Sequence, residues 1–79
     1  MPTIHRIGAT TIRVNTPDHL PPHVHVVLAD GRDCFVHIDT LQVIRSPKAK
    51  IKDADIADAL AWIAANRATC HRVFKECNP

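Results

Sequence analysis

The stretch Asp18-His19-Leu20-Pro21-Pro22-His23-Val24-His25-Val26 decides how the first half of this chain is organised. It carries three of the six histidines, and two prolines stand directly before the His-x-His pair. Proline restricts the backbone, and the side chains of a strand alternate between its two faces. His23 and His25 are therefore expected on one face of a strand, either as an assembled polar site or as a wet sheet surface rich in imidazole.

The residues that follow predict a β-hairpin whose register decides which histidines meet. The runs 23–28 and 33–39 flank Ala29-Asp30-Gly31. A two-residue turn would mix polar and apolar side chains on both faces, whereas a three-residue loop with Gly31 in the left-handed region pairs His23 with His37. We expect the second register, because it separates the two kinds of side chain and a one-residue slip would exchange the faces. Its apolar face holds Val24, Val26, Leu28, Cys34, Val36 and Ile38, and its other face holds His23, His25, Val27, Asp33, Phe35 and His37.

The remaining segments predict three further strands and one helix. Runs rich in β-branched residues at 3–7 and 11–14 suggest an opening hairpin, and 41–45 is a fifth strand. From Asp53 to Lys75 apolar residues recur at steps of three and four, broken by Arg67, which predicts one long amphipathic helix that can kink near Asn66. We expect a single α+β domain over residues 1–79: an antiparallel sheet of four to five strands, covered on one face by the C-terminal helix. The histidine face is left for solvent, a ligand or a partner.

Composition narrows the class of protein. Seventy-nine residues with 46% hydrophobic and 23% charged residues indicate one small globular domain. The start of the chain shows no signal peptide, and no apolar run is long enough to span a membrane. Three cysteines without Cys-x-x-Cys spacing indicate reduced thiols and a cytoplasmic protein. Four cations without an acid between Arg45 and Lys52 form an anion footprint or an ordinary solvated loop.

The residues also resemble a known family. Met1-Pro2-Thr3-Ile4, the nine-residue stretch quoted above and Trp62-Ile63-Ala64-Ala65-Asn66-Arg67 are similar to domain-of-unknown-function family 4160. Its members are small bacterial and phage proteins, often encoded beside a member of unknown-function family 2442. The pairing resembles a type II toxin–antitoxin module, which implies a toxin-like role here, a cognate antitoxin-like partner and no membrane. This chain has Phe74 where many relatives carry a second tryptophan, and its 45–52 segment is more basic than usual.

Three hypotheses for the histidines stay open. In the first, His23, His25 and His37 bind a divalent metal such as zinc, with His19 or Asp18 as a fourth ligand or an orienting group. In the second, His23 and His25 act as general base and acid in RNA cleavage, with Asp18 orienting His19 or His23 and a nearby cation, Arg13, Arg32 or Lys48, stabilising phosphate charge. These two hypotheses make Asp18, His19, His23 and His25 the candidate catalytic residues.

In the third hypothesis the protein is a non-catalytic interaction module. Asp18 to His25 is then a structural clasp, and the sheet face binds a partner protein. Other chemistries have little support: the chain has only two glycines and one serine, and its cysteines fall on predicted core positions. His5 and His71 are assigned to surface or local packing, and Trp62 to the core edge or a partner interface.

Overall fold

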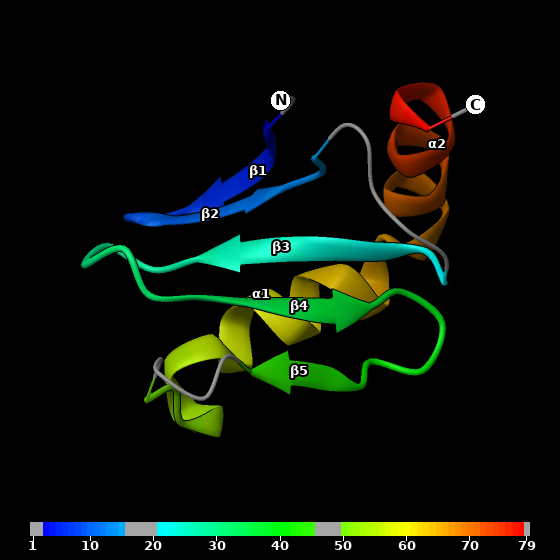
Figure 1. Cartoon of the computed structure of the whole chain (residues 1–79). Helices are drawn as coiled ribbons and strands as arrows, with labels where there is room; N and C mark the ends of the chain where they lie inside the picture. Colours follow the sequence, from blue (N-terminus) through cyan, green and yellow to red (C-terminus); the bar gives the residue numbers. More distant parts are fainter. Residues whose placement is uncertain (1–2, 16–20, 46–49, 79) are drawn as a thin grey trace.

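The computed structural model of the chain describes residues 3–15, 21–45 and 50–78, and within these segments five strands form one antiparallel sheet. The strands are β1 (Thr3–Ile7), β2 (Thr10–Arg13), β3 (His23–Val27), β4 (Asp33–His37) and β5 (Val43–Arg45). Their order in the sheet is β1-β2-β3-β4-β5, so every strand pairs with its neighbours in sequence (Figure 1). The predicted α+β class and the five antiparallel strands are confirmed.

The β3–β4 hairpin has the predicted register. His23 lies opposite His37, Val24 opposite Val36 and Val26 opposite Cys34. The Leu28 amide donates to the Arg32 carbonyl at 2.8 Å, which closes a three-residue loop. Gly31 has φ +90°, a left-handed conformation in which a residue with a side chain would be strained. The separation of polar from apolar faces, read from the sequence, therefore identified the correct loop.

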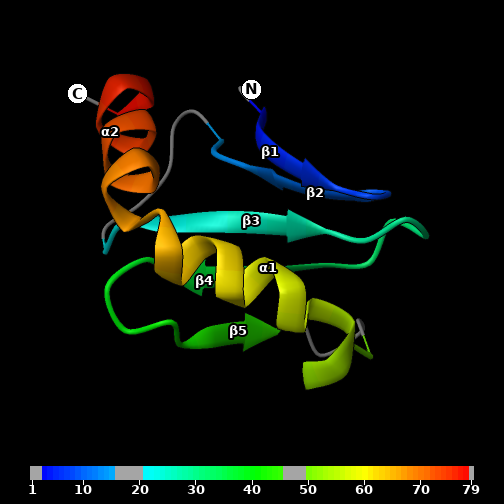
Figure 2. The same cartoon turned by 180° about the vertical axis from the view of Figure 1, so that it is seen from behind.

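Two helices follow the sheet. α1 (Asp53–Ala65) lies across one face of the sheet, and α2 (Arg67–Cys77) stands beside the end of β3 at which His23 begins the strand (Figures 1 and 2). The carboxylate of Asp55 accepts the Lys52 amide at 3.0 Å, which satisfies one of the backbone donors left free where α1 begins. No helix in the described segments combines the length and the apolar character needed to cross a membrane.

The prediction of one long helix from Asp53 to Lys75 is wrong, because the chain breaks at Asn66. The side-chain amide of Asn66 donates to the Trp62 carbonyl at 2.9 Å, taking the acceptor that the Asn66 backbone amide would use in a continuous helix. That backbone amide donates instead to Ile63, at 3.1 Å, and the residue has φ −129° and ψ 33°. The break turns α2 away from α1 and brings it against the end of β3.

The core lies between the sheet and the two helices. It contains the predicted apolar hairpin face and the apolar stripe of the helices. Its buried members are Ile12, Val14, Val24, Val26, Leu28, Cys34, Val36, Ile38, Ile51, Ile56, Ala59, Ile63, Cys70 and Phe74. Trp62 packs at the edge of this core and stacks on His5, with ring centroids 4.5 Å apart and planes 5° apart. The three cysteines are free thiols.

Candidate functional site

The sheet has a second face, away from α1, which we call the open face. Residues paired directly across antiparallel strands share a face, so the strand register places Arg13, His25, Phe35 and Ile44 in one row across this surface. A neighbouring row contains His23 and His37. The three histidines of the predicted site therefore do share the face opposite α1.

His23 and His25 are nevertheless buried, with only 8% and 5% of their surfaces exposed. The expectation that this face is left open is therefore wrong for its histidine half. The physical reason is aromatic packing from two sides. The His25 and Phe35 ring centroids lie 4.4 Å apart in an edge-on arrangement, and His23 lies 5.2 Å from Phe35 and 5.8 Å from Phe74 of α2. The bend at Asn66 places α2 beside the start of β3, where Phe74 meets His23.

His23 makes a hydrogen bond to the backbone that precedes it. Its Nδ1 lies 3.0 Å from the carbonyl oxygen of Pro21. A carbonyl only accepts, so Nδ1 carries the proton in this geometry. The contact uses one side of the imidazole to satisfy a carbonyl just after the stretch 16–20, and it sets the orientation of the ring.

His25 makes its hydrogen bond to the residue that follows β2. The amide nitrogen of Asn15 lies 3.1 Å from His25 Nε2, so Nε2 accepts and is unprotonated in this geometry. Asn78, just after α2, donates its side-chain amide to the Asn15 carbonyl at 3.3 Å. His23 and His25 therefore hold residues 21 and 15, the two described residues on either side of 16–20, and Asn15 also contacts the end of α2.

Arg13 lies beside the histidine pair. It pairs with His25 across β2 and β3, and its Nε is buried without a hydrogen-bond partner among the described residues. The centroids of His23 and His25 are 5.2 Å apart with their planes tilted by 56°. Two imidazoles and a guanidinium thus lie on one small area of the open face.

The other predicted site residues are placed less closely or fall outside the described residues. Asp18 and His19 belong to 16–20 and lie outside them. His37 is half-buried opposite His23. Within residues 3–15, 21–45 and 50–78, no group of three or more His, Cys, Asp or Glu side chains is arranged to hold a metal ion. The catalytic and metal roles of these residues stay predictions.

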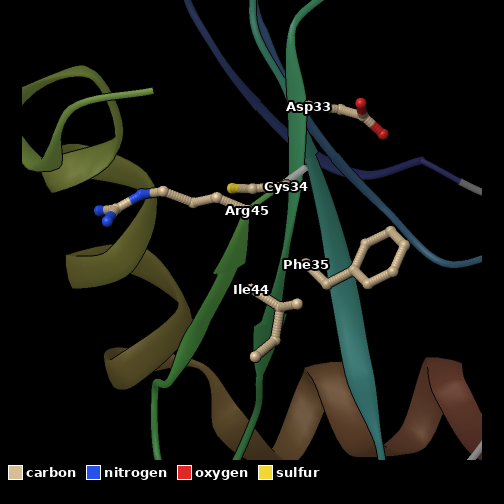
Figure 3. Close-up of a pocket in the computed structure, with 5 residues that line it drawn as sticks. All are labelled: Asp33, Cys34, Phe35, Ile44 and Arg45. Atoms are coloured by element: carbon tan, nitrogen blue, oxygen red, sulfur yellow. The ribbon is translucent and has the colours of Figure 1, made fainter. Parts of the chain in front are cut away.

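The other half of the open face has the opposite character. Phe35 and Ile44 face each other across β4 and β5 and are each 40% exposed, the large hydrophobic residues most open to solvent among those described. A hollow of about 240 Å³ lies beside them, lined by Asp33, Cys34, Phe35, Ile44 and Arg45. Figure 3 shows Asp33 and Phe35 pointing to one side of the sheet, and Cys34 and Arg45 pointing toward α1.

Sequence reasoning missed the importance of this half. The predicted register had already put Phe35 on the histidine face, and the alternation along β5 would have put Ile44 beside it. Asn15 and Phe74 were missed as partners of the histidines because their contacts join segments far apart in the chain. The signal available in sequence was the presence of two large apolar residues at positions that the register assigns to the outer face.

Two of the three cysteines, Cys34 and Cys70, are buried. Burial raises the pKa of the Cys34 thiol and that of the Cys70 thiol, because a thiolate would lose its hydration there. Both side chains lie in the core, away from the open face.

Comparison with known proteins gives a family and nothing beyond it. The family model described as "Domain of unknown function (DUF4160)" matches residues 11–72. No curated protein and no solved structure matches the chain. The matched range includes every strand from β3 to β5, the whole of α1 and the histidine stretch.

Proposed function

The chain belongs to the DUF4160 family, and we propose that it is a non-catalytic protein-interaction module that binds a partner protein on the open face. The observation that carries the proposal is the apolar patch, which we define as Phe35 and Ile44. Both side chains are exposed next to a hollow of about 240 Å³, while the two histidines of the same face are buried.

The energetics of exposure support this assignment. Each square ångström of apolar surface removed from water contributes roughly 25 cal/mol, so two large exposed side chains at paired positions of β4 and β5 can supply a binding anchor. Interface energy concentrates in a few large apolar and aromatic residues surrounded by polar groups. Asp33, which points to the same side of the sheet as Phe35, provides such a polar neighbour beside the hollow. The patch therefore has the composition of a small protein-binding surface.

The contacts of the histidines support the role of the Asp18–His25 stretch as a structural clasp. His23 bonds to Pro21 and His25 bonds to Asn15, so both rings tie the ends of the β2–β3 connection to the sheet. Phe74 on His23 and Asn78 on Asn15 add α2 to the same cluster. A catalytic imidazole needs access to substrate, and each of these rings is more than nine-tenths covered.

We propose a cognate, antitoxin-like protein as the partner, in keeping with the pairing of this family with members of family 2442. The test is co-expression of the tagged chain with the family 2442 protein encoded beside it. A Phe35→Ser/Ile44→Ser variant is expected to lose at least tenfold in affinity, whereas Ile7→Ser on the distant strand β1 is expected to bind normally. Equal binding by wild type and by the patch variant would refute the proposal. The role of this chain as the toxin of such a pair stays a prediction, for which growth on expression is the measurement.

One observation favours a second candidate, histidine-dependent cleavage of RNA. The His23 and His25 rings lie 5.2 Å apart, and Arg13 on the same face has a buried Nε without a described partner. Such a set can supply a base, an acid and a cation for a phosphodiester. RNA degradation by the wild type, abolished in a folded His25→Gln variant that keeps an Asn15 partner, would support it. Degradation that persists undiminished would exclude it.

A further inference from the structure

The apolar patch adjoins a free edge of the sheet. β5 is the last strand in the sheet order, and it pairs with β4 on one side only. In Figures 1 and 2 no strand of the described chain lies beyond β5, and only the beginning of α1 extends past it, near one end of the strand. A strand edge carries backbone donors and acceptors that a further strand can use, and natural sheets usually shorten, charge or cover it. β5 is only three residues long. An edge strand this short limits aggregation of the free protein and can still pair with a strand of a partner.

The hydrogen-bond pattern between β4 and β5 determines which backbone groups of β5 face away from the sheet. The His37 amide donates to the Gln42 carbonyl at 3.0 Å, so these residues form a hydrogen-bonded pair. Bonded and non-bonded pairs alternate in antiparallel sheets, which makes Phe35 and Ile44 the next bonded pair. The amides and carbonyls of Val43 and Arg45 consequently point away from β4. β5 thus presents two residues with outward hydrogen-bonding groups.

The side chains of β5 indicate which residue types an added strand should contain on each of its faces. Ile44 lies on the open face with Phe35, and Arg45 points toward the α1 side (Figure 3). A strand paired with β5 would also alternate, with one set of side chains beside the apolar patch and the other set beside Arg45. The first set should be apolar, and the second should be compatible with a guanidinium.

Charge around the edge favours an acidic occupant. Residues 43–55 contain four cations, Arg45, Lys48, Lys50 and Lys52, against two acids, Asp53 and Asp55. Arg45 is paired with Asp53, and the side chains of Lys50 and Lys52 are exposed. A second copy of the chain would carry the same excess of positive charge in this segment, which disfavours its addition at β5 at ordinary salt. An acidic segment from another protein would neutralise them.

From these observations we propose that the partner contributes an extended segment of alternating acidic and apolar residues, which pairs with β5 as an additional strand and places an apolar side chain against Phe35 and Ile44. This is recognition by strand addition, in which backbone hydrogen bonds supply affinity and alternate side chains supply specificity. The inference rests on the proposed function, because it names the partner chemistry for the same surface.

A blocked peptide of sequence EVEFEVE tests the inference with the full chain. We expect a Kd on the order of 100 μM by NMR titration, with the largest shifts at the amides of Val43 and Arg45. The charge-reversed peptide KVKFKVK should bind at least tenfold more weakly. Two N-methylated versions provide the decisive pair, one methylated at the Glu residues and one at the apolar residues. Because alternate residues of a strand point their amides to opposite edges, one methylated peptide should bind with at least tenfold lower affinity, and the affinity of the other should change less than threefold.

The protein-side variant is Val43→Pro, which removes an outward amide and no ladder bond to β4. This variant should bind the EVEFEVE peptide at least tenfold more weakly than wild type, with an unchanged circular dichroism spectrum. If the variant fails to fold, the two N-methylated peptides still test strand addition. Equal binding of both methylated peptides, a Kd above about 1 mM for EVEFEVE, or a dimer dispersed by Val43→Pro would overturn strand addition. The family 2442 experiment with Phe35→Ser/Ile44→Ser decides the proposed function separately, so the two can fail independently.

Discussion

The two halves of the open face invert the usual distribution of residues. In the β2–β3 half, two imidazoles are buried, His23 against Phe35 and Phe74 and His25 against Phe35. In the β4–β5 half, Phe35 and Ile44 remain 40% exposed beside a hollow. Buried polar groups in proteins are normally hydrogen-bonded, and exposed apolar patches often mark interaction sites. The comparison teaches that polarity alone did not identify the surface available to a partner, since the polar half is buried and the apolar half is exposed.

The largest effect should come from removing both histidines. His23→Ala/His25→Ala deletes two hydrogen bonds and the ring contacts that seat α2, for an expected loss of about 3–4 kcal/mol of unfolding free energy. A domain of this size has a stability of only about 4–12 kcal/mol, so the variant should unfold at much lower urea. A urea titration followed by circular dichroism measures it. Wild-type stability in this variant would contradict the structural clasp.

A smaller loss is expected when one end of the clasp is released. Asn15→Ala removes the amide that His25 accepts from and leaves a buried ring nitrogen without that donor, which should cost about 1–2 kcal/mol. Gln42→Ala, at an exposed position beside β5, is the matched control and should change stability by less than about 0.5 kcal/mol. Equal losses in the two variants would mean that the histidine half is no more important to folding than the edge.

The patch variant should separate stability from binding. Phe35→Ser/Ile44→Ser changes side chains that are already partly in water, and Phe35 also contacts both histidines, so we expect a loss of about 1 kcal/mol or less per residue. Partner binding should nevertheless fall at least tenfold. Thermal melting and titration on the same samples provide the comparison. A large loss of stability without a binding defect would reverse the roles assigned to the two halves.

The smallest effect on stability near neutral pH is expected from the core cysteines, whose contribution changes only at higher pH. The folded state raises the pKa of Cys34 and Cys70 above the ordinary value of 9.0, so it holds these protons more tightly than the unfolded chain. Their contribution is fully present below about pH 9 and is lost as the pH rises through the folded pKa. Urea midpoints measured from pH 7 to pH 10.5 should decline above pH 9, and Cys34→Ala/Cys70→Ala should flatten that decline. A decline of the same slope in both proteins would assign it to other groups.

Metal dependence is a separate check on the histidine half. Because His23 and His25 each use a ring nitrogen in a protein hydrogen bond, we expect a chelator to shift the melting temperature by less than about 2 °C. A stoichiometric metal that copurifies and is lost in the double histidine variant would establish the metal hypothesis instead. Elemental analysis of wild type and variant gives the answer.

Much of the fold could be predicted because it depends on local rules. The alternation along 23–28 and 33–39, together with the need for a left-handed residue at Gly31, was sufficient for the hairpin loop and the pairing of His23 with His37. The helical period located both helices, and Asn66 was identified as a point of weakness, although a continuous helix was expected there.

What the sequence determined by itself was the face on which each strand residue lies, because a period of two and one loop type settle it through local geometry. The tertiary structure alone decided which of those residues remain in contact with water. The amide of Asn66 ends α1, α2 turns toward the start of β3, and Phe74 closes over His23. Burial depends on elements that are distant in the chain, and no local pattern around residues 23 to 25 contains the direction of a helix that begins at residue 67.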